Sequence, residues 1–583
     1  MRIRGALAAM ALSLIAAGCG SGHAAQDPAS AASLAPGGTV PLKVITSSTA
    51  AVAIVRVRIN GSAALPFLVD TGASRSVLAR SVARRLGIST SGSQRVQGVA
   101  CSARAQGAVV SRWSVGNVQL PAERVEVVPL AVGGGQLAGL IGSDVLSKFG
   151  AIAINYASAR LELGSPAIKL PASGTQTVAL KVASGSGGVL TEAPISINGH
   201  GPFPFVVDSG AAASVIATSV ATRLALPLRR TGAKVSGVAC QAGTSTATVS
   251  RWSVGSLKLP GQKLIATKLT ARMGTGFAGL LGSGTLRHFG VVELNYARQQ
   301  LDLARHRRAP AGGVVRLRLR YRGQSVAAVV LVKIDGRGPF PFALDTGASR
   351  SVIDRRLARQ LNLHSTGASA RLSGVIATAR AQLYALRGWS VGGIALPVEQ
   401  IPALRLHSAR AAPGHIDGLL GSNTLRHFGQ ITLEYSRHLL RLGRSASGAN
   451  RGPAVPLNMI SSAGAAQATV LVRIGGGGPY PFILDTGAGR SVLARPLAQR
   501  LGLRVLGSAS VGGVNGASRA EVVAVRQWKL GSVRLPAARP VALPLAALGG
   551  GVVGLLGSDV LRHFRTITIE FRRGRLFLRR SSG

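Results

Sequence analysis

The sequence predicts a mainly β protein that is built from four copies of one domain. Runs of alternating apolar and polar residues, such as Ala53–Ile59, are followed by turn residues such as Asn60-Gly61, the pattern of a strand and a tight turn. In each copy only a short segment repeats apolar residues every four positions, as Leu78, Val82 and Leu86 do, and this spacing predicts one short helix. The whole pattern then recurs at a regular interval, which predicts tandem copies of a single fold.

The composition fits several folded domains and excludes two other classes of protein. At about 100 to 200 residues per domain, a chain of 583 residues holds three to five domains. Lys and Arg number 68 against 20 Asp and Glu, a net charge of +48, but 46% of the residues are hydrophobic, which is too many for a disordered polycation. Three cysteines are too few for a scaffold built on disulfides.

The positive charge does not by itself indicate nucleic-acid binding. The arginines are dispersed along the chain, and we find neither an RNP-type nor a helix-turn-helix signature, so we expect no nucleic-acid partner. An arginine-rich surface on a folded protein is the interpretation that we favour. Adsorption to anionic lipid or to an anionic wall polymer is the alternative.

The amino terminus resembles a bacterial export signal. Arg2 and Arg4 precede an uncharged apolar run, Ala6–Ala17, which has the length of a signal peptide and is too short to cross a bilayer as a mature helix. The run ends in Ala16-Ala17-Gly18-Cys19, which resembles the lipobox of bacterial lipoproteins, although that motif usually has Leu at the position of Ala16. The resemblance implies that Cys19 becomes the lipidated first residue of the mature protein, held by several acyl chains. A plain secretory signal with a chance cysteine is the alternative.

The chain divides into six expected segments. Residues 1–19 form the signal peptide with its lipobox, and residues 20–40, rich in Ser, Ala and Gly, form a flexible tether. The four copies, called repeats 1 to 4, span residues 41–165, 177–304, 314–443 and 455–579. No uninterrupted apolar run of about 18 residues follows residue 19, so we expect an extracytoplasmic body that is anchored at the outer face of the cell membrane or secreted.

Each repeat places an aspartate at the end of an apolar strand, followed by a small hydroxyl residue and glycine. The aspartates stand at intervals of 138, 137 and 140 residues. A second motif, Gly-Leu-Leu-Gly or Gly-Leu-Ile-Gly, follows each one, and all four tryptophans fall 43 or 44 residues after an aspartate. The aspartates are Asp70, Asp208, Asp345 and Asp485; the hydroxyl residues are Thr71, Ser209, Thr346 and Thr486; and the glycines are Gly72, Gly210, Gly347 and Gly487.

This loop suits acid and base chemistry when two copies of it meet. Two aspartates brought together across a two-fold axis share one proton, because like charges about 3 Å apart cannot both ionise. One carboxyl group then acts as a general base toward water and the other as a general acid toward a scissile amide. The hydroxyl group can donate across the axis and hold the carboxylates coplanar, and glycine lets the two backbones approach. A single loop of this kind would have a structural role instead.

The Asp loop and the second motif resemble those of the retropepsin/pepsin superfamily of aspartic proteases, and the bacterial retropepsin-like domains in particular. The resemblance covers nearly all of residues 41–579 and implies four tandem retropepsin-like acid-protease β-barrel domains. It implies that the four loop aspartates are catalytic and that the hydroxyl and glycine residues support the dyads. It also implies flaps over the substrate at Gln97–Gln106, Ser236–Thr244, Ser373–Ala381 and Gly512–Ala520.

Active sites of this superfamily need two Asp loops, so four repeats imply either two pepsin-like pseudo-dimers or four half-sites that each need a second chain. Cys101 and Cys240 occupy matching flap positions in repeats 1 and 2, where repeats 3 and 4 have Ala377 and Gly516. If repeats 1 and 2 pair, the two flap tips meet, and a disulfide could form in an oxidising exterior. We therefore favour pairing of repeat 1 with 2 and of repeat 3 with 4. Two unrelated free thiols are the alternative.

The sequence predicts an exported, lipid-anchored aspartic endopeptidase that hydrolyses peptide bonds in peptide or protein substrates. We expect no cofactor and no metal, because the ten histidines form no ligand spacing and Cys-x-x-Cys is absent. The alternative is a non-catalytic peptide-binding or scaffolding lipoprotein of the envelope with the same fold. Repeat 2 has the run Ala211–Ala213, and repeat 4 has Gly489 where repeats 1 and 3 have serine, but no repeat lacks its aspartate.

Overall fold

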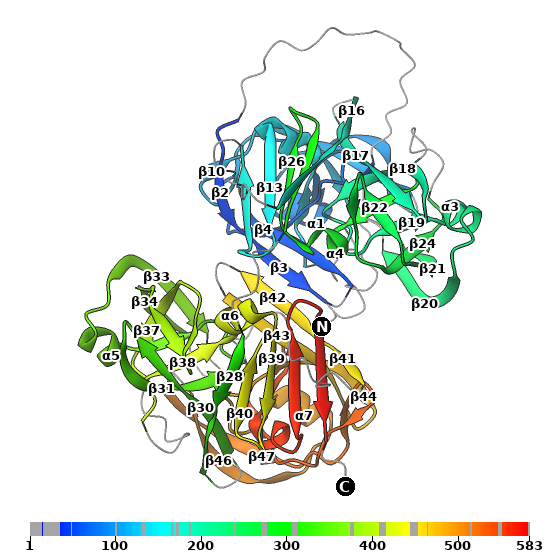
Figure 1. Cartoon of the computed structure of the whole chain (residues 1–583). Coiled ribbons are helices and arrows are strands. Elements are labelled where there is room, and N and C mark those ends of the chain that lie inside the picture. The colour runs from blue at the N-terminus through cyan, green and yellow to red at the C-terminus, as the bar shows by residue number, and fades with distance from the viewer. Residues whose placement is uncertain are drawn as a thin grey trace. The chain divides into compact units, whose positions relative to one another are not determined.

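The chain forms two compact units, unit 1 (Met1–Arg307) and unit 2 (Arg308–Gly583) (Figure 1). Unit 1 contains repeats 1 and 2, and unit 2 contains repeats 3 and 4. The computed structural model describes residues 14–15, 35–47, 49–98, 102–130, 136–164, 168, 170, 174–185, 188–236, 241–269, 277–305, 312–322, 325–373, 378–406, 415–443, 453–462, 465–513, 516–545 and 551–580.

Each repeat begins with a meander of strands that ends at the Asp loop. In repeat 1 these strands are β3 (Lys43–Thr46), β4 (Ala51–Ile59) and β5 (Leu65–Val69), each antiparallel to the next. β4 contains the strand that the alternating pattern predicts. Asn60 and Gly61 after it have φ angles of 50° and 75°, which a tight hairpin turn needs.

The rest of repeat 1 adds further strands to the sheet of this meander, two strands of a second sheet, and short helices. Its elements are β6 (Val77–Ala79), α1 (Arg80–Arg85), β7 (Ser91–Gly98), β8 (Ser102–Val110), β9 (Trp113–Val115), β10 (Val118–Gln119), β11 (Glu123–Val128), β12 (Gly139–Ile141), α2 (Ser143–Leu146), the 3-10 helix Ser147–Phe149, β13 (Ala151–Asn155) and β14 (Arg160–Leu163). The sheet has the order β7-β8-β11-β6-β12-β5-β4-β9-β10. β12, which carries the second motif, therefore lies between the strand before the Asp loop and the strand after it.

The other repeats follow the same plan. Repeat 2 consists of β15 (Thr175–Ala179), β16 (Lys181–Gly185), β17 (Gly188–Ile197), β18 (His200–Asp208), β19 (Val215–Ala217), α3 (Thr218–Arg223), β20 (Leu228–Ser236), β21 (Gln241–Val249), β22 (Trp252–Val254), β23 (Leu257–Lys258), β24 (Gln262–Thr267), β25 (Gly279–Gly282), α4 (Ser283–Leu286), β26 (Phe289–Asn295) and β27 (Gln300–Arg305). Repeat 3 consists of β28 (Gly313–Arg316), β29 (Arg318–Arg322), β30 (Ser325–Ile334), β31 (Arg337–Asp345), β32 (Val352–Asp354), α5 (Arg355–Gln360), β33 (Ser365–Ser373), β34 (Thr378–Leu386), β35 (Trp389–Val391), β36 (Ile394–Ala395), β37 (Glu399–Leu404), β38 (Gly418–Gly421), α6 (Ser422–Leu425), the 3-10 helix Arg426–Phe428, β39 (Gln430–Glu434) and β40 (Leu439–Leu442). Repeat 4 consists of β41 (Ala454–Pro456), β42 (Asn458–Ser462), β43 (Ala465–Ile474), β44 (Gly477–Leu484), β45 (Val492–Ala494), α7 (Arg495–Arg500), β46 (Val505–Gly513), β47 (Gly516–Val523), β48 (Trp528–Leu530), β49 (Val533–Arg534), β50 (Val541–Leu543), β51 (Gly554–Leu556), α8 (Ser558–Leu561), β52 (Thr566–Glu570) and β53 (Arg575–Arg579).

The helix after each Asp loop is present but shorter than its spacing indicates. Leu78 belongs to β6 and not to the helix, which starts at Arg80. The reason is that Leu78 pairs on both sides, opposite Val127 of β11 and Gly139 of β12, so its backbone is part of the sheet. Gly87 after the helix has a φ of 63°, the left-handed conformation expected at this position.

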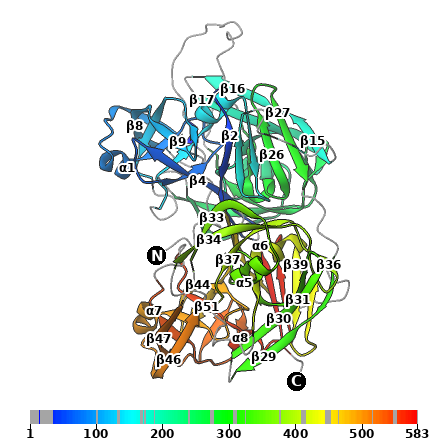
Figure 2. The same ribbon diagram turned by 90° about the vertical axis from the view of Figure 1, so that its left-hand side faces the viewer.

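A second sheet in each unit contains strands of both repeats. In unit 1 its order is β15-β27-β26-β13-β14-β2, where β2 spans Gly38–Pro41, and Figure 2 shows β15, β27 and β26 side by side. In unit 2 the order is β28-β40-β39-β52-β53-β41. Because β2 pairs with β14, the ordered repeat starts at Gly38, within the segment 20–40 that we expected to be a flexible tether.

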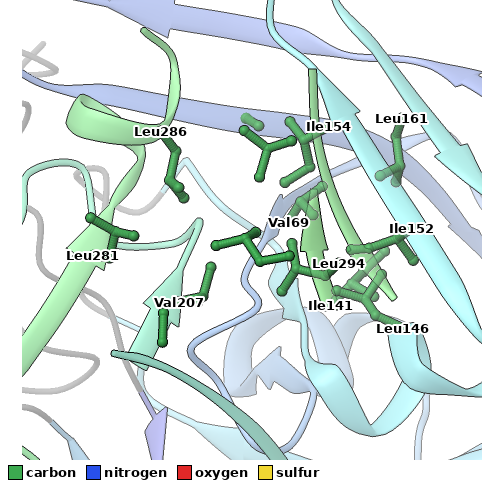
Figure 3. Close-up of a cluster of buried hydrophobic side chains, with 14 of the residues drawn as sticks. Val69, Ile141, Leu146, Ile152, Ile154, Leu161, Val207, Leu281, Leu286 and Leu294 are labelled. Atoms are coloured by element: carbon green, nitrogen blue, oxygen red, sulfur yellow. The ribbon is translucent and has the colours of Figure 1, made fainter. Parts of the chain in front are cut away.

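Buried side chains of repeats 1 and 2 form one continuous core in unit 1. Figure 3 shows Val69, Ile141 and Ile152 of repeat 1 together with Val207 and Leu294 of repeat 2. The four tryptophans are core residues, all 2 to 4% exposed. Because β5 and β18 contribute Val69 and Val207, the strands that lead to the Asp loops are anchored in this core.

A two-residue strand near the amino terminus, β1 (Leu14–Ile15), pairs antiparallel with β7, with Leu14 opposite Gly98 and Ile15 opposite Gln97. Both residues belong to the apolar run that we expected to be part of a signal peptide. The edge of β7 therefore accepts an extended segment as an additional strand. Among the residues that the structure describes, no helix is long and apolar enough to span a membrane.

Candidate active site

Each loop aspartate lies at the end of a buried strand, beside the strand of the second motif. In repeat 1 the Asp70 N–H donates to Ile141 O of β12 at 3.0 Å. The N–H groups of Gly72 and Ala73 donate to Asp70 Oδ1 at 3.1 and 3.0 Å. Asp485 is held in the same way by two loop N–H groups at 2.9 and 2.8 Å. The carboxylate is thus oriented by its own loop.

The loops of repeats 1 and 2 are hydrogen-bonded to each other in unit 1. Thr71 Oγ1 donates to Val207 O at 2.7 Å and accepts from the Ser209 N–H at 2.9 Å. Ser209 Oγ donates to Val69 O at 2.8 Å and accepts from the Thr71 N–H at 3.0 Å. These four bonds relate the two loops by an approximate two-fold axis and hold the two aspartates next to each other. The hydroxyl groups therefore lie where the motif places them.

The loops of repeats 3 and 4 are bonded in the same pattern in unit 2. Thr346 Oγ1 donates to Leu484 O at 2.8 Å and accepts from the Thr486 N–H at 3.0 Å. Thr486 Oγ1 donates to Leu344 O at 2.8 Å and accepts from the Thr346 N–H at 3.1 Å. Serine in unit 1 and threonine in unit 2 make the same bonds, because only the hydroxyl group takes part.

The loop glycines leave room for the carboxylates of the opposite repeat. A Cβ atom on Gly72 would lie 2.6 Å from Oδ1 of Asp208, and one on Gly210 would overlap the carboxyl group of Asp70. The two glycines of unit 2 stand in the same relation to the aspartates opposite them. Each carboxylate thus lies over the glycine of the other loop, and the two carboxylates of a unit face each other.

Burial raises the pKa of all four aspartates. Asp70 and Asp208 have no exposed surface, and burial is the largest cause of the raised pKa of each. The Asp208 carboxylate raises the pKa of Asp70 further, while hydrogen bonds from the loop N–H groups oppose the shift. Burial is also the main cause of the raised pKa of Asp345 and of Asp485, and for Asp485 the Asp345 carboxylate adds to it. Such a pair retains one proton to a higher pH than an isolated aspartate does.

A serine directly after the second motif supports each Asp loop, and the sequence analysis missed it. Ser143 Oγ donates to Thr71 O at 2.9 Å, and Ser283 Oγ donates to Ser209 O at 2.8 Å. The equivalent serines of repeats 3 and 4 make the same contact at 2.8 Å. A signal was present, because serine follows the last glycine of this motif in all four repeats.

A β-hairpin occupies each expected flap region. The hairpins pair β7 with β8, β20 with β21, β33 with β34 and β46 with β47. The tips lie outside the described residues, and so do Cys101 and Cys240. The disulfide between them stays a prediction. Lipidation of Cys19 also stays a prediction, because Cys19 lies outside the described residues too.

A charged pair lies between the flap and the Asp loop of repeat 1. Gln94 of β7 donates through Nε2 to Glu126 Oε1 at 2.5 Å, and Arg75 lies 3.4 Å from the same oxygen. Glu126 is 1% exposed. At the equivalent positions of repeat 2, Ala213 and Ile265 pack in an apolar cluster. The two sides of the unit 1 site therefore differ in polarity.

Within the described ranges, no group of three or more His, Cys, Asp or Glu side chains is arranged to hold a metal ion. His427, one of the histidines next to a buried phenylalanine, lies 3.6 Å from Glu399 Oε1. Burial and the nearby Arg426 lower the pKa of His427 to about 4, so its imidazole is neutral at physiological pH.

The paired Asp loops, each beside a strand of the Gly-Leu-Leu-Gly type, and the hairpin in each repeat are the features of a fold of the aspartic protease type. The sequence pattern described as aspartyl protease matches residues 55–145, 193–285, 330–424 and 470–560, which is more than half of the chain. The chain therefore belongs to the aspartyl protease family. The comparison with curated proteins found no match. Among solved structures, the chain is similar to the crystal structure of aspartic proteinase from Irpex lacteus, with 12% identity, a TM-score of 0.30, and coverage of 47% of this chain and 98% of that chain.

Proposed function

We propose that the chain is an aspartic endopeptidase with two active sites, Asp70 with Asp208 and Asp345 with Asp485. The observation that carries this proposal is the set of hydroxyl bonds that joins the Asp loops two by two within each unit. Two pepsin-like pseudo-dimers, repeats 1 with 2 and 3 with 4, account for these bonds without a second chain. The sheet that the two repeats of each unit share supports the same pairing.

The geometry of the pair fits hydrolysis of an amide by an activated water. The ionised carboxylate takes a proton from water, whose oxygen attacks the carbonyl carbon of the substrate while the protonated partner donates to the carbonyl oxygen. The C–N bond then breaks as its nitrogen takes up a proton, and the pair is left with one proton again. In unit 1 both aspartates are fully buried and the pKa of each is raised, which suits a pair that keeps one proton between its two carboxyl groups.

The flap of repeat 1 supports a peptide as the substrate. An extended peptide can bind to a protein as an added strand at the edge of a sheet, because its backbone N–H and C=O groups then form hydrogen bonds with that edge. β1 adds to the edge of β7 in this way, through Leu14 and Ile15. A flap strand with such an edge suits an extended polypeptide better than it suits a compact small molecule.

Cleavage of an unfolded protein and of a peptide library between about pH 3 and pH 7 tests the proposal, since dyads with a shared proton work in the acidic to neutral range. We expect cleavage that a statine-containing peptide inhibits. The double variant Asp70→Asn with Asp345→Asn should lose it. Asp335→Asn is the matched control, because asparagine occupies the equivalent turn positions 60 and 198.

Two outcomes separate the proposal from the non-catalytic alternative. Absence of cleavage by the wild-type chain over the whole pH range overturns the endopeptidase. Binding of the statine-containing peptide without cleavage then identifies a peptide-binding protein that uses the same site.

We also propose that the chain is exported and lipid-anchored through Cys19. Arg2, Arg4 and the apolar run that ends at Cys19 support this proposal. Labelling with a fatty acid should mark the wild type and not a Cys19→Ala variant. An unlabelled wild type that is recovered in the medium would identify a plain secretory signal instead.

A further inference from the structure

In unit 1 a tyrosine hydroxyl group is hydrogen-bonded to each of the two serines that support the Asp loops. Tyr296 OH lies 3.0 Å from Ser143 Oγ, and Ser143 Oγ donates its proton to Thr71 O at 2.9 Å. Tyr296 must therefore be the donor to Ser143, because a serine hydroxyl group has only one proton. In the other loop, Tyr156 OH lies 2.7 Å from Ser283 Oγ and has the same role.

This series of hydrogen bonds ends on the carboxylate of the aspartate. Thr71 O belongs to the same peptide group as the Gly72 N–H, and this N–H donates to Asp70 Oδ1 at 3.1 Å. Successive hydrogen bonds polarise one another, so a peptide group whose carbonyl accepts a strong bond is a stronger N–H donor. Tyr296 thus acts on Asp70 through Ser143 and one peptide group, without contact with the reacting atoms.

Each tyrosine supports the aspartate of the other repeat. Tyr296 follows β26 of repeat 2 and supports the loop of repeat 1, while Tyr156 follows β13 of repeat 1 and supports the loop of repeat 2. The crossing arises because β13 and β26 run antiparallel, which brings the end of each strand beside the start of the other (Figure 1). The Tyr296 N–H, for example, donates to Gly150 O at 2.9 Å.

Unit 2 contains this arrangement on one side only. Tyr435 OH lies 3.4 Å from Ser558 Oγ, which donates to the loop carbonyl of repeat 4 at 2.8 Å. At the fourth equivalent position the chain has Phe571, which is 5% exposed. Ser422 still donates to the loop carbonyl of repeat 3 at 2.8 Å, but the residue behind it has no hydroxyl group.

The three tyrosines are buried and stay neutral, so they remain donors over the working range of an aspartate pair. Burial raises the pKa of Tyr156 and Tyr296 far above the usual value and that of Tyr435 to about 12. Each is 5 to 7% exposed. Removal of a buried phenol leaves the serine oxygen short of a donor that bulk water does not readily replace.

We propose that Tyr156, Tyr296 and Tyr435 are positioning residues, each of which orients and strengthens, through a serine and a peptide group, the N–H donor to the aspartate of the opposite repeat. Phe571 then makes the Asp345 loop the one loop that lacks this support. The inference rests on the proposed function, because it concerns the same aspartates.

The test uses the full chain with one active site at a time. In an Asp485→Asn background only unit 1 can turn over, and we compare Tyr296→Phe with the unchanged Tyr296. The acidic limb of the pH profile of kcat/KM should move to higher pH by about 0.2 to 0.6 of a pH unit, because a weaker N–H donor raises the pKa of the Asp70 carboxyl group. We expect kcat to fall about two- to fivefold at the acidic side and KM to stay unchanged, because the phenol does not touch substrate. Asn198→Asp is the control within unit 1, because aspartate already occupies the equivalent turn position 335.

The reciprocal variant adds the missing hydroxyl group. In an Asp70→Asn background only unit 2 can turn over, and Phe571→Tyr should move its acidic limb down. Combining Phe571→Tyr with Ser422→Ala should cancel this gain, because the serine connects the phenol to the loop. A gain that persists without the serine contradicts the proposed route.

A measurement without turnover separates this inference from the proposed function. With carbon-13 in the aspartate carboxyl groups, NMR titration reads the pKa of the dyad directly in the wild type and in Tyr296→Phe. A higher pKa of the dyad in Tyr296→Phe than in the wild type supports the action of Tyr296 through Ser143, even if the chain cleaves no substrate. Equal pKa values, together with a lower unfolding midpoint of the variant, would show that Tyr296 only packs, and the inference fails.

Discussion

Units 1 and 2 hold their Asp loops by the same hydrogen bonds but cover them differently. The bonds between the loops measure 2.7 to 3.0 Å in unit 1 and 2.8 to 3.1 Å in unit 2. Asp70 and Asp208 are fully buried in unit 1, whereas in unit 2 Asp345 is partly exposed and Gly487 is exposed. The residues of the Asp-loop motif therefore determine the geometry of the loops, and the elements around the loops determine how far solvent reaches them.

The residues beneath the loops differ as well. After the second motif and its serine, repeats 1 and 4 have Asp144 and Asp559, repeat 3 has Asn423, and repeat 2 has Gly284. In repeat 2 a Cβ atom at Gly284 would collide with the Thr49 carbonyl, so the space that a side chain fills elsewhere is taken by backbone. The four repeats thus keep one Asp-loop motif on three different supports, an aspartate, an asparagine or a backbone segment.

The largest expected effect is the loss of one active site at a time. Asp208→Asn should remove cleavage by unit 1 only and Asp485→Asn cleavage by unit 2 only, each by about 10² to 10⁴-fold, the usual worth of a general acid or base. We expect unit 2 to carry more of the cleavage of large protein substrates, because its loops are more exposed. Initial rates of the two variants on a denatured protein and on a short peptide measure how much of the cleavage each unit carries out. Complete loss of cleavage in either single variant would show that the units do not act separately.

The next effect is a pH dependence of stability that Asp144 gives to unit 1. Asp144 accepts hydrogen bonds from the Ser76 N–H at 2.7 Å, from Ser76 Oγ at 2.7 Å and from the Val145 N–H at 2.8 Å, but burial outweighs them and raises its pKa to about 7 from a usual value of 3.8. Between these values the unfolded chain has already released the proton and the folded chain has not. The free energy of unfolding therefore falls as the pH rises from about 4 to about 7, by at most about 4 kcal/mol.

Asn423 provides the matched comparison for this prediction. Its amide oxygen accepts from the Ser351 N–H at 2.6 Å, so an amide fits the position. Asp144→Asn should reduce the fall in unit 1, and Asn423→Asp should increase it in unit 2, because the other buried aspartates of each unit, whose pKa values are also raised, contribute to the fall as well. Hydrogen exchange at pH 4.5 and pH 7.5, read on core peptides of each unit, measures both. An unchanged pH dependence in both variants would show that Asp144 is ionised throughout.

Much of the site could be predicted from the sequence because the motif is local. Asp70, Thr71 and Gly72 are adjacent, and their recurrence in four repeats made the loop recognisable. The cross-axis role of the hydroxyl group also followed from the motif, and the structure has these bonds. The short helix after the loop was predicted with the wrong start, because apolar spacing does not distinguish Leu78 in a doubly paired strand from the first turn of a helix.

The remaining parts could not be predicted because they join residues that are far apart in the chain. Tyr296 and Ser143 are 153 residues apart and belong to different repeats, so no local pattern links them. The pair Arg75 and Glu126 depends on the packing of β11 beside β6, which only the fold provides. The cysteines that favoured pairing of repeats 1 and 2 lie outside the described residues, and the interloop hydrogen bonds supply the support for that pairing instead.

Loss of the interloop hydroxyl bonds should have the same effect in both units. Thr71→Val keeps the shape of the side chain but leaves the Ser209 N–H and Val207 O without partners, and Thr346→Val does the same in unit 2. Two buried polar groups without partners cost about 2 to 3 kcal/mol in the free energy of unfolding. Urea unfolding with a probe in each unit measures this loss, and Thr71→Ser is the control, because Ser209 already makes the same bonds. A clearly smaller loss in unit 2 would mean that its greater exposure lets water replace the missing hydroxyl group.

The smallest expected effect concerns the polar side of the unit 1 site. Arg75→Ala removes the ion-pair partner of the buried Glu126, while the Gln94 hydrogen bond remains. We expect a loss of about 1 to 2 kcal/mol in the free energy of unfolding, less than for a fully buried pair, because Arg75 is 18% exposed. The double variant Arg75→Ala with Glu126→Ile copies Ala213 and Ile265 of repeat 2, whose side chains pack together, and it should be close to the wild type in stability. Urea midpoints of the single and double variants decide the matter: if the double variant is as unstable as the single one, the polar pair and not merely the filled space stabilises this side of the site.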